Sequence, residues 1–211
     1  AGLQCEAVGV EVDADLVELH FGRNIAPSFF AWTIPIGEDS ARLGLGCGAP
    51  RATFFLNAFI KKRAPKARVV KKFGGPIVTS GPIPKTYFRR LLVVGDAAGQ
   101  VKPTTGGGVV LGCLCAKIAG EVAVESIEQE DFSAEFFSRY EKRWRKLLGR
   151  ELSAMLMLRR VVNSLPDEAL DLAFWLIKSF GVDQKLSEVG DMDFQSKAIR
   201  ALLTGGLLVS K

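Results

Sequence analysis

The sequence predicts a mixed α/β fold, with strands concentrated in the first part of the chain and helices in the last. Residues 6–47 alternate between apolar and polar side chains, residues 91–94 are a short apolar run before a glycine-rich turn, and apolar side chains recur at helical spacing after residue 130. The 211 residues, 48% of them apolar, suffice for a sizeable core in one or two domains.

The first 50 residues carry the strongest β pattern. Residues 6–22 alternate around Asp13-Ala14-Asp15, which predicts a β-hairpin. Residues 28–36 and 41–47 predict two more strands around a turn at 37–40. This part of the chain is therefore expected to be mostly antiparallel sheet.

The segment that follows combines one helix with an extended stretch. A helix is predicted from Arg51 to Lys62, and the face expected to be buried is Phe54, Phe55, Ala58 and Phe59. Residues 73–84 are expected to be extended because glycine and proline recur in them.

Residues 91–94 (Leu-Leu-Val-Val) predict a buried parallel strand that ends at Gly95-Asp96. A glycine-rich turn follows, and a helix is predicted from about residue 107 to residue 127.

The remainder of the chain is predicted to be helical. A long helix is expected to begin at Asp131 or Ser133 and to run to about residue 162. Ser164-Leu165-Pro166-Asp167 is typical of a second helix start, and this helix is expected to end at Gly181. A last helix is expected at about 193–203, before Gly205-Gly206.

Composition excludes several classes of protein. Four scattered cysteines are too few for a disulfide scaffold and indicate a reducing, cytoplasmic setting. The single histidine, His20, argues against a histidine metal site or a Ser/His triad, so no metal is expected. The net charge of +5 arises in basic clusters that are most simply solvated surface, and no nucleic-acid motif accompanies them.

The turn after residues 91–94 carries the clearest chemistry. Asp96 is placed to accept hydrogen bonds from sugar or ribityl hydroxyls, although a turn or cap aspartate is the simpler interpretation of this residue alone. Gly106, Gly107 and Gly108 would present bare backbone N–H groups at a helix N-terminus, where an anionic reduced flavin ring is stabilised. A phosphate-binding glycine loop is the alternative, but the Gly-Lys-Ser/Thr of a P-loop is absent.

Two motifs together resemble one family. Residues 94–108, Val-Gly-Asp-Ala-Ala-Gly-Gln-Val-Lys-Pro-Thr-Thr-Gly-Gly-Gly, resemble the second flavin motif of the geranylgeranyl reductase family, a branch of the para-hydroxybenzoate-hydroxylase-like flavoproteins. Residues 27–35, Pro-Ser-Phe-Phe-Ala-Trp-Thr-Ile-Pro, are similar to that family's Pro-x-x-Tyr-x-Trp-x-Phe-Pro, with Phe30 for Tyr and Ile34 for Phe. The resemblance covers roughly residues 1–180.

The resemblance implies a set of site residues. Gly95, Asp96, Pro103 and the three glycines 106–108 would bind FAD. Phe30, Trp32, Ile34 and Pro35 would form the wall of the substrate pocket, although Phe30, Trp32 and Ile34, which share one face of a strand, would otherwise be taken as ordinary sheet core. Because Phe30 replaces a tyrosine, the wall lacks a phenolic proton donor at this position.

The implied reaction is FAD-dependent reduction of C=C bonds in geranylgeranyl chains of isoprenoid lipids. Reduced FAD would deliver the hydride, so no catalytic side chain is assigned, and Cys47 is most simply a small buried residue. The implied partners are a prenyl lipid and an external electron donor, NAD(P)H or ferredoxin. Peripheral membrane contact is a second interpretation of 170–177 and of the helix that carries Phe136, Phe137, Tyr140 and Trp144, both of which are most simply core.

The Gly-x-Gly-x-x-Gly expected for the FAD pyrophosphate does not occur in these residues. The chain is therefore expected to be a C-terminal portion that is inactive by itself. Residues 1–85 would belong to a mostly antiparallel substrate-binding domain, 86–128 to the C-terminal part of an FAD-binding Rossmann-like domain, and 129–211 to a helical region.

Two rival functions remain at this point. A flavin monooxygenase or dehydrogenase would use the same scaffold, and NAD(P)H-dependent oxygen uptake stimulated by an aromatic substrate would favour it. A non-catalytic lipid-binding module would bind vesicles without a flavin spectrum.

Overall fold

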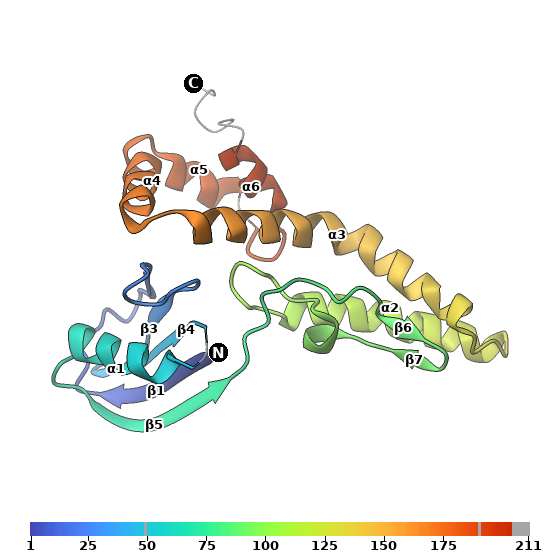
Figure 1. Ribbon diagram of the computed structural model, residues 1–211, viewed down its shortest axis with the longest axis horizontal. Coiled ribbons are helices and arrows are strands. Elements are labelled where there is room, and N and C mark those ends of the chain that lie inside the picture. The colour runs from blue at the N-terminus through green and yellow to red at the C-terminus, as the bar shows by residue number, and fades with distance from the viewer. Residues whose placement is uncertain (49, 190, 204–211) are drawn as a thin grey trace. The chain divides into compact units, whose positions relative to one another are not determined.

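A computed structural model describes residues 1–48, 50–189 and 191–203. The chain divides into two compact units, each described here by itself (Figure 1). The first unit is Ala1–Ile77 with Leu165–Asp171, and the second is Val78–Ser164 with Leu172–Lys211.

A five-stranded antiparallel sheet forms the first unit, with strand order β2-β3-β4-β1-β5. Its strands are β1 (Gly2–Val8), β2 (Glu18–His20), β3 (Ala31–Gly37), β4 (Ser40–Gly46) and β5 (Arg68–Gly75). The predicted strands at 28–36 and 41–47 are confirmed as β3 and β4, which form a hairpin. Of the stretch 73–84 that was expected to be extended, residues 73–75 lie in strand β5, which begins earlier, at Arg68, and residues 76–84 form neither strand nor helix.

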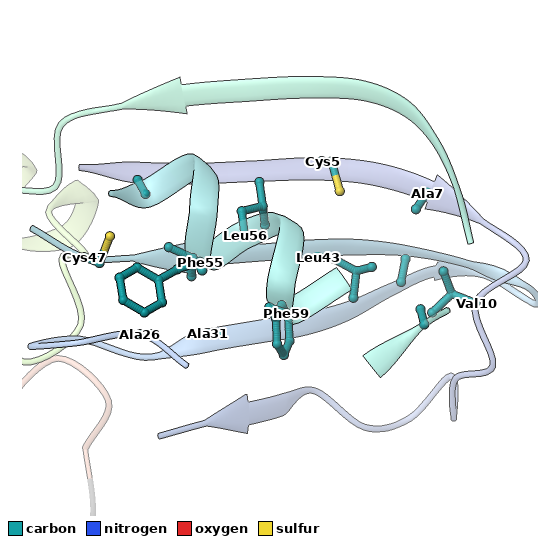
Figure 2. Packing of buried hydrophobic residues seen from close by; sticks show 14 residues of the cluster. Cys5, Ala7, Val10, Ala26, Ala31, Leu43, Cys47, Phe55, Leu56 and Phe59 are labelled. Atoms are coloured by element: carbon teal, nitrogen blue, oxygen red, sulfur yellow. The ribbon is translucent and has the colours of Figure 1, made fainter. Parts of the chain in front are cut away.

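One helix, α1 (Ala52–Arg63), covers one face of this sheet. Alternate strand residues such as Cys5, Ala31 and Leu43 point toward it, and Phe55 and Phe59 of the helix meet them (Figure 2). The period of two in β1, β3 and β4 thus gives the sheet one buried face. The opposite face carries Trp32 and the other outward residues of the same strands.

Two expectations for the first unit are wrong. Residues 6–22 do not form a hairpin, because β1 pairs with β4 and β5 whereas β2 pairs with β3. Alternation fixes which face a residue occupies but not which strand it pairs with. Phe54, at 61%, and Ala58 are exposed although both were expected on the buried face of α1; Ala52 and Leu56 lie there instead, beside Phe55 and Phe59.

The end of α1 is tied to β2 by an ion pair. Arg63 donates from Nε to Glu18 Oε2 at 2.7 Å and from Nη2 to the carbonyl oxygen of Glu11 at 2.9 Å. His20 Nε2 lies 3.1 Å from the same Glu18 carboxylate. The hydrogen bonds from Arg63 are the main reason that the pKa of Glu18 lies below its ordinary value.

We expect Glu18→Gln to lower the free energy of unfolding at neutral pH, because Gln cannot pair with Arg63. A folded-state pKa below the unfolded value contributes stability that is present above the unfolded pKa and is lost as pH falls through the folded one. The difference between wild type and variant should therefore shrink below pH 4.5, the ordinary value for this group. Urea unfolding from pH 3 to pH 7 measures it, and a difference that does not change with pH would contradict the account.

The second unit is built around two long helices, α2 (Val109–Glu128) and α3 (Ala134–Ser164), which run side by side (Figure 1). Ser133 caps α3, since its Oγ accepts a hydrogen bond from the N–H of Phe136 at 3.1 Å. Both helices and the cap are confirmed predictions. A small hairpin of β6 (Tyr87–Phe88) and β7 (Leu91–Leu92) precedes α2.

The core of this unit lies between α2 and α3. Trp144 and Tyr140 of α3 are fully buried against Leu111, Cys115 and Val122 of α2. The expectation that the aromatic residues of α3 are core is confirmed. Cys113 is exposed whereas Cys115 is buried, as their separation of about 200° around a helix requires.

The predicted parallel strand at 91–94 is wrong in this structure. Only Leu91 and Leu92 are in a strand, and they pair antiparallel with Tyr87 and Phe88. Leu91 is 50% exposed rather than buried. An apolar run of four residues indicates a strand, but it specifies neither its partner nor its direction.

Three shorter helices complete the described chain: α4 (Asp167–Ser179), α5 (Val182–Val189) and α6 (Ser196–Leu203). The start of α4 at Pro166-Asp167 and its end before Gly181 are confirmed, whereas α5 was not predicted. None of the residues of α4 is buried, so the expectation that 170–177 is core is wrong. The last helix begins at Ser196 rather than 193, and Gly205-Gly206 lies outside the described residues.

Candidate flavin turn and aromatic sheet face

The turn after β7 is held in a conformation that needs glycine. Residues Gly95–Ala98 form one 3₁₀ turn, and both Gly95 and Gly99 have positive φ, at 69° and 67°. A Cβ on Gly99 would lie 2.3 Å from the carbonyl oxygen of Gly81, so no side chain fits there. Glycine is therefore required directly before Asp96 and three residues after it.

A buried hydrogen-bond relay fixes this turn to α3. Gln100 is fully buried, and its Oε1 accepts from the N–H of Gly95 at 2.8 Å. Its Nε2 donates to the Tyr140 hydroxyl at 2.8 Å, and that hydroxyl donates to the carbonyl oxygen of Val93 at 3.0 Å. Burial raises the pKa of Tyr140 to about 12, so the phenol remains a donor at physiological pH. Sequence reasoning missed the role of Gln100 and gave Tyr140 no hydrogen-bonding role.

A second set of hydrogen bonds joins residues 83–86, which precede β6, to α3. The Trp144 indole donates from Nε1 to Thr86 Oγ1 at 2.9 Å. Thr86 in turn donates to Glu141, from its N–H at 2.7 Å and from its hydroxyl at 3.0 Å. Arg145 completes the set, since it donates to Glu141 and to the carbonyl oxygens of Ile83 and Pro84. Helix α3 thus holds both sides of the hairpin that leads into the turn.

The glycines 106–108 lead directly into α2, as predicted. Gly106 has φ +75° and donates to the carbonyl oxygen of Lys102 at 2.8 Å. No side chain caps the N-terminus of α2, whose first residue, Val109, is 81% exposed. The backbone N–H groups of the first helical turn are therefore open to an anionic group.

Asp96 and Gly108 meet beside this helix end. A Cβ on Gly108 would lie 2.6 Å from Asp96 Oδ1, so glycine leaves the room that the carboxylate occupies. Asp96 is exposed, and its carboxylate accepts no hydrogen bond from the residues that the structure describes. A free acceptor beside open backbone donors fits the polar edge of a flavin ring with its ribityl hydroxyls.

Residues 102–104 are covered by the segment before α6. Lys102 is buried, and its ammonium donates to Asp193 Oδ1 at 2.7 Å and to the carbonyl oxygen of Met192 at 3.0 Å. Thr104 donates to the side chain of Gln195 at 2.9 Å. These bonds hold the Lys102 side chain against the segment before α6.

Pro103 also lies in this covered stretch. It is buried, and its carbonyl oxygen accepts a hydrogen bond from Arg159 Nη1 at 3.1 Å. The ring contributes rigidity to the turn, and a direct cofactor contact at Pro103 stays a prediction.

In the first unit, Phe30, Trp32 and Ile34 lie on the sheet face opposite α1, as their alternation predicts. Phe30 stacks on Phe29 with ring centroids 4.3 Å apart and meets Trp32 edge-on at 6.0 Å. Pro35 also lies in β3, but beyond the three residues of β3 that pair with β2. Proline has no N–H to donate, so it suits a position where no neighbouring strand needs that hydrogen bond.

Glycines in the neighbouring strands make room for this aromatic row. A Cβ on Gly44 would lie 2.4 Å from the Trp32 indole, and one on Gly46 would lie 2.4 Å from the Phe29 ring. The rings therefore lie flat against the β4 backbone. The alternating glycines Gly44 and Gly46 are the sequence signal for this arrangement.

A cleft of about 340 Å³ opens beside Trp32 on the same unit. Trp32 donates from Nε1 to Gln4 Oε1 at 3.3 Å, which fixes the indole at the edge of the cleft. Phe73 and Ile77 line the cleft with them, whereas Phe30, Ile34 and Pro35 do not. Gln4 and Phe73 were not predicted as site residues.

Other candidate chemistry finds no support among the described residues. They contain no cluster of three or more His, Cys, Asp or Glu side chains that could hold a metal ion. Cys47 is buried, and burial raises the pKa of its thiol, as expected for an inert residue. Within the part of the chain that the structure covers, no helix is both long and apolar enough to cross a membrane.

The sequence is similar to a set of archaeal reductases. Residues 1–77 match the family model of the geranylgeranyl reductase catalytic domain. Digeranylgeranylglycerophospholipid reductase 2 of Methanothermobacter thermautotrophicus is 45% identical over 174 residues, which are 80% of this chain and 45% of the relative. The reductase of Methanocaldococcus jannaschii is 41% identical over 191 residues, 85% of this chain and 48% of the relative. The chain thus spans about half the length of the curated relatives it matches.

Solved structures extend the comparison to nearly the whole chain. A geranylgeranyl bacteriochlorophyll reductase-like protein from Thermoplasma acidophilum matches 96% of this chain and 51% of its own, with a TM-score of 0.81 and 26% identity. A flavin-dependent halogenase matches 98% of this chain and 44% of its own, with a TM-score of 0.55. At 14% sequence identity this match shows only that the two proteins share a fold. Sequence and structure together show that the chain belongs to the geranylgeranyl reductase family.

Proposed function

We propose that the full-length protein carrying this chain reduces C=C bonds in the geranylgeranyl chains of isoprenoid lipids, with FAD as its cofactor. The observation that carries the proposal is the aromatic sheet face with its cleft at Trp32, in a chain that also holds a glycine-built turn suited to a flavin. The curated relatives bear names that describe the same reaction class.

The chain's own residues would bind and orient the cofactor. Asp96 would accept hydrogen bonds from ribityl hydroxyls, and Gly108 would let the ring approach the N-terminus of α2. The positive end of the helix would favour a reduced, anionic ring edge. FAD, when bound and reduced, supplies the hydride that a C=C bond accepts.

The aromatic face would hold the prenyl chain and exclude water. Trp32, Phe73 and Ile77 present apolar surface, and the Gln4 amide oxygen at the cleft accepts the Trp32 N–H. Phe30 offers no hydroxyl, so among the described residues of this face no side chain is a suitable proton donor. A proton added to the second carbon would then come from water or from the rest of the protein.

We further propose that residues 1–85 contribute to substrate binding, that 86–128 contribute to the flavin site, and that 129–211 form a supporting helical region. The hydrogen bonds that join α3 to Thr86, Val93 and Gln100 support the last role. The reaction also requires an external electron donor, NAD(P)H or ferredoxin, to reduce the flavin.

We expect Gly44→Ala to raise KM for a prenyl lipid at least tenfold while leaving FAD affinity unchanged. The added methyl group would force the Trp32 indole off the strand, and with it one wall of the cleft. Steady-state kinetics and flavin titration of the full-length protein measure the two quantities. Gly37→Ala is the matched control, because its Cβ would meet only Ser40 at 3.5 Å. An unchanged KM in Gly44→Ala would refute the substrate role of this face.

A further inference from the structure

Residues 191–196, called the clasp below, lead into α6 and lie against the loop that leads into α2. The ammonium of Lys102 donates to Asp193 Oδ1 at 2.7 Å and to the carbonyl oxygen of the preceding residue at 3.0 Å. Thr104 donates its hydroxyl proton to Gln195 Oε1 at 2.9 Å. Both stretches belong to the second unit, so these bonds join parts of one compact body.

The clasp is itself held at its start and at its end. Asp191 Oδ1 accepts hydrogen bonds from the N–H groups of Asp193 at 2.8 Å and Phe194 at 3.0 Å. Ser196 donates from its N–H to Glu151 Oε2 of α3 at 2.8 Å and from its hydroxyl to the same carboxylate. The Phe194 ring packs against the core between α2 and α3. The clasp therefore presents its acceptors to the loop from a fixed position.

Lys102 joins the clasp to the glycines of the flavin turn. Its carbonyl oxygen accepts from the N–H of Gly106 at 2.8 Å and of Thr105 at 3.3 Å, and its own N–H donates to the carbonyl oxygen of Gly107 at 3.1 Å. Its side chain also runs beside Gly107, where a Cβ would lie 2.9 Å from the lysine Cε. Lys102 thus closes the loop 102–107 with its backbone and holds the clasp with its ammonium.

The burial of this lysine makes the clasp and the loop depend on each other. The side chain of Lys102 is only 10% exposed, and that of Asp193 is 29% exposed. An opened clasp would take the carboxylate and the carbonyl oxygen away from the ammonium together. A nearly buried ammonium without acceptors is costly, so the lysine would have to turn toward water and release its contact with Gly107.

We propose that the clasp regulates the cofactor site. When it is closed, it orders the loop 102–107 through Lys102, which acts as a positioning residue, and so raises the affinity of the turn for FAD. The inference rests on the proposed function for the identity of the cofactor. Because the coupling of two binding events is reciprocal, FAD bound at the loop stabilises the closed clasp by the same factor.

The first test measures FAD affinity of the full-length protein with the variants Asp193→Asn and Lys102→Met. Asparagine keeps the size of Asp193 but not its charge, and methionine keeps the apolar stem of Lys102 but not its ammonium. We expect each variant to raise the Kd for FAD about tenfold in a flavin fluorescence titration. The double variant should bind FAD no more weakly than the weaker single variant does, because the two residues share one ion pair.

Hydrogen exchange separates this coupling from a merely structural role. In wild type, saturating FAD should slow amide exchange in the clasp about tenfold relative to the flavin-free protein. In Lys102→Met at saturating FAD, exchange in the clasp should equal that of the flavin-free variant, whereas a purely structural role would leave the dependence on FAD in place. Lys117→Met and Asp183→Asn are matched controls, since they remove the same charges from exposed positions on α2 and α5. Both should match wild type in affinity and exchange.

The outcomes distinguish the clasp from the proposed function. Wild-type FAD affinity in both clasp variants, an equal loss of affinity in the controls, or clasp exchange that FAD does not alter in wild type would each overturn the clasp. If FAD slows exchange in the clasp but the protein reduces no prenyl chain, the proposed function fails and the clasp stands. If the protein reduces prenyl chains and the clasp variants bind FAD as wild type does, the clasp fails and the function stands.

Discussion

Gly108→Ala should weaken FAD binding by the full-length protein at least tenfold, which corresponds to about 1.4 kcal/mol. The backbone of Gly108 has φ −117° and ψ −9°, a conformation that alanine adopts without strain. The added Cβ would, however, lie 2.6 Å from Asp96 Oδ1 and 3.1 Å from Val101 Cγ2. The Asp96 carboxylate must therefore move, and a methyl group takes the place where the ring would approach the helix end. Flavin fluorescence titration measures the affinity.

The stability of this variant should change by less than about 1 kcal/mol, because only flexible side chains must shift. Gly120→Ala is the control on the same helix: its Cβ would meet nothing within 4 Å, so FAD affinity should remain at the wild-type value. A tenfold weaker affinity in both variants would mean that helix α2 acts through its overall stability. Unchanged affinity in Gly108→Ala would remove Asp96 and Gly108 from the cofactor site.

Gln100→Leu should lower the free energy of unfolding by about 2 to 3 kcal/mol. Leucine fills a similar volume in this fully buried site but cannot accept the N–H of Gly95 or donate to the Tyr140 hydroxyl. The partly buried N–H of Gly95 and the Tyr140 hydroxyl then each lose a hydrogen bond, and leaving polar groups unpaired away from water is costly. Urea unfolding followed by circular dichroism measures the change.

A double-mutant cycle with Tyr140→Phe tests whether the loss of stability in Gln100→Leu comes from the hydrogen bond between these two side chains. Gln100 and Tyr140 share one hydrogen bond, so their combined effect should fall short of the sum of the single effects by about 0.5 kcal/mol or more. Full additivity would show that the two side chains act independently. We also expect Gln100→Leu to weaken FAD binding, because the hydrogen bond from Gly95 to Gln100 sets the position of the turn directly before Asp96.

Local patterns in the sequence predicted much of the fold. The cap at Ser133, the helix start at Pro166-Asp167 and the turn between β3 and β4 each depend on residues within a few positions of one another. Strand pairing is not local in this sense. Residues 6–22 alternate as a hairpin would, yet β1 lies between β4 and β5, and long-range packing decides that choice.

The same distinction applies to the candidate sites. Glycines 106–108 and the alternating residues Phe30, Trp32 and Ile34 are visible in the sequence, and the structure places them at a helix end and on one sheet face. Gln100 and Gln4 could not be found in this way, because their partners Tyr140 and Trp32 lie 40 and 28 residues away. In α4 the sequence predicted too much rather than too little: its apolar residues were expected to be core, but they are exposed. A hydrophobic segment favours burial without guaranteeing it.

The central claim is that this chain belongs to an enzyme that saturates prenyl chains with a flavin. The most direct measurement incubates the full-length protein, purified with FAD and chemically reduced under anaerobic conditions, with a geranylgeranyl lipid, and follows the lipid by mass spectrometry. The account predicts a gain of two hydrogens, about 2 Da, for each double bond reduced, together with reoxidation of the flavin. A flavin that is reoxidised only by oxygen, with the lipid unchanged in mass or gaining an oxygen atom, would contradict it.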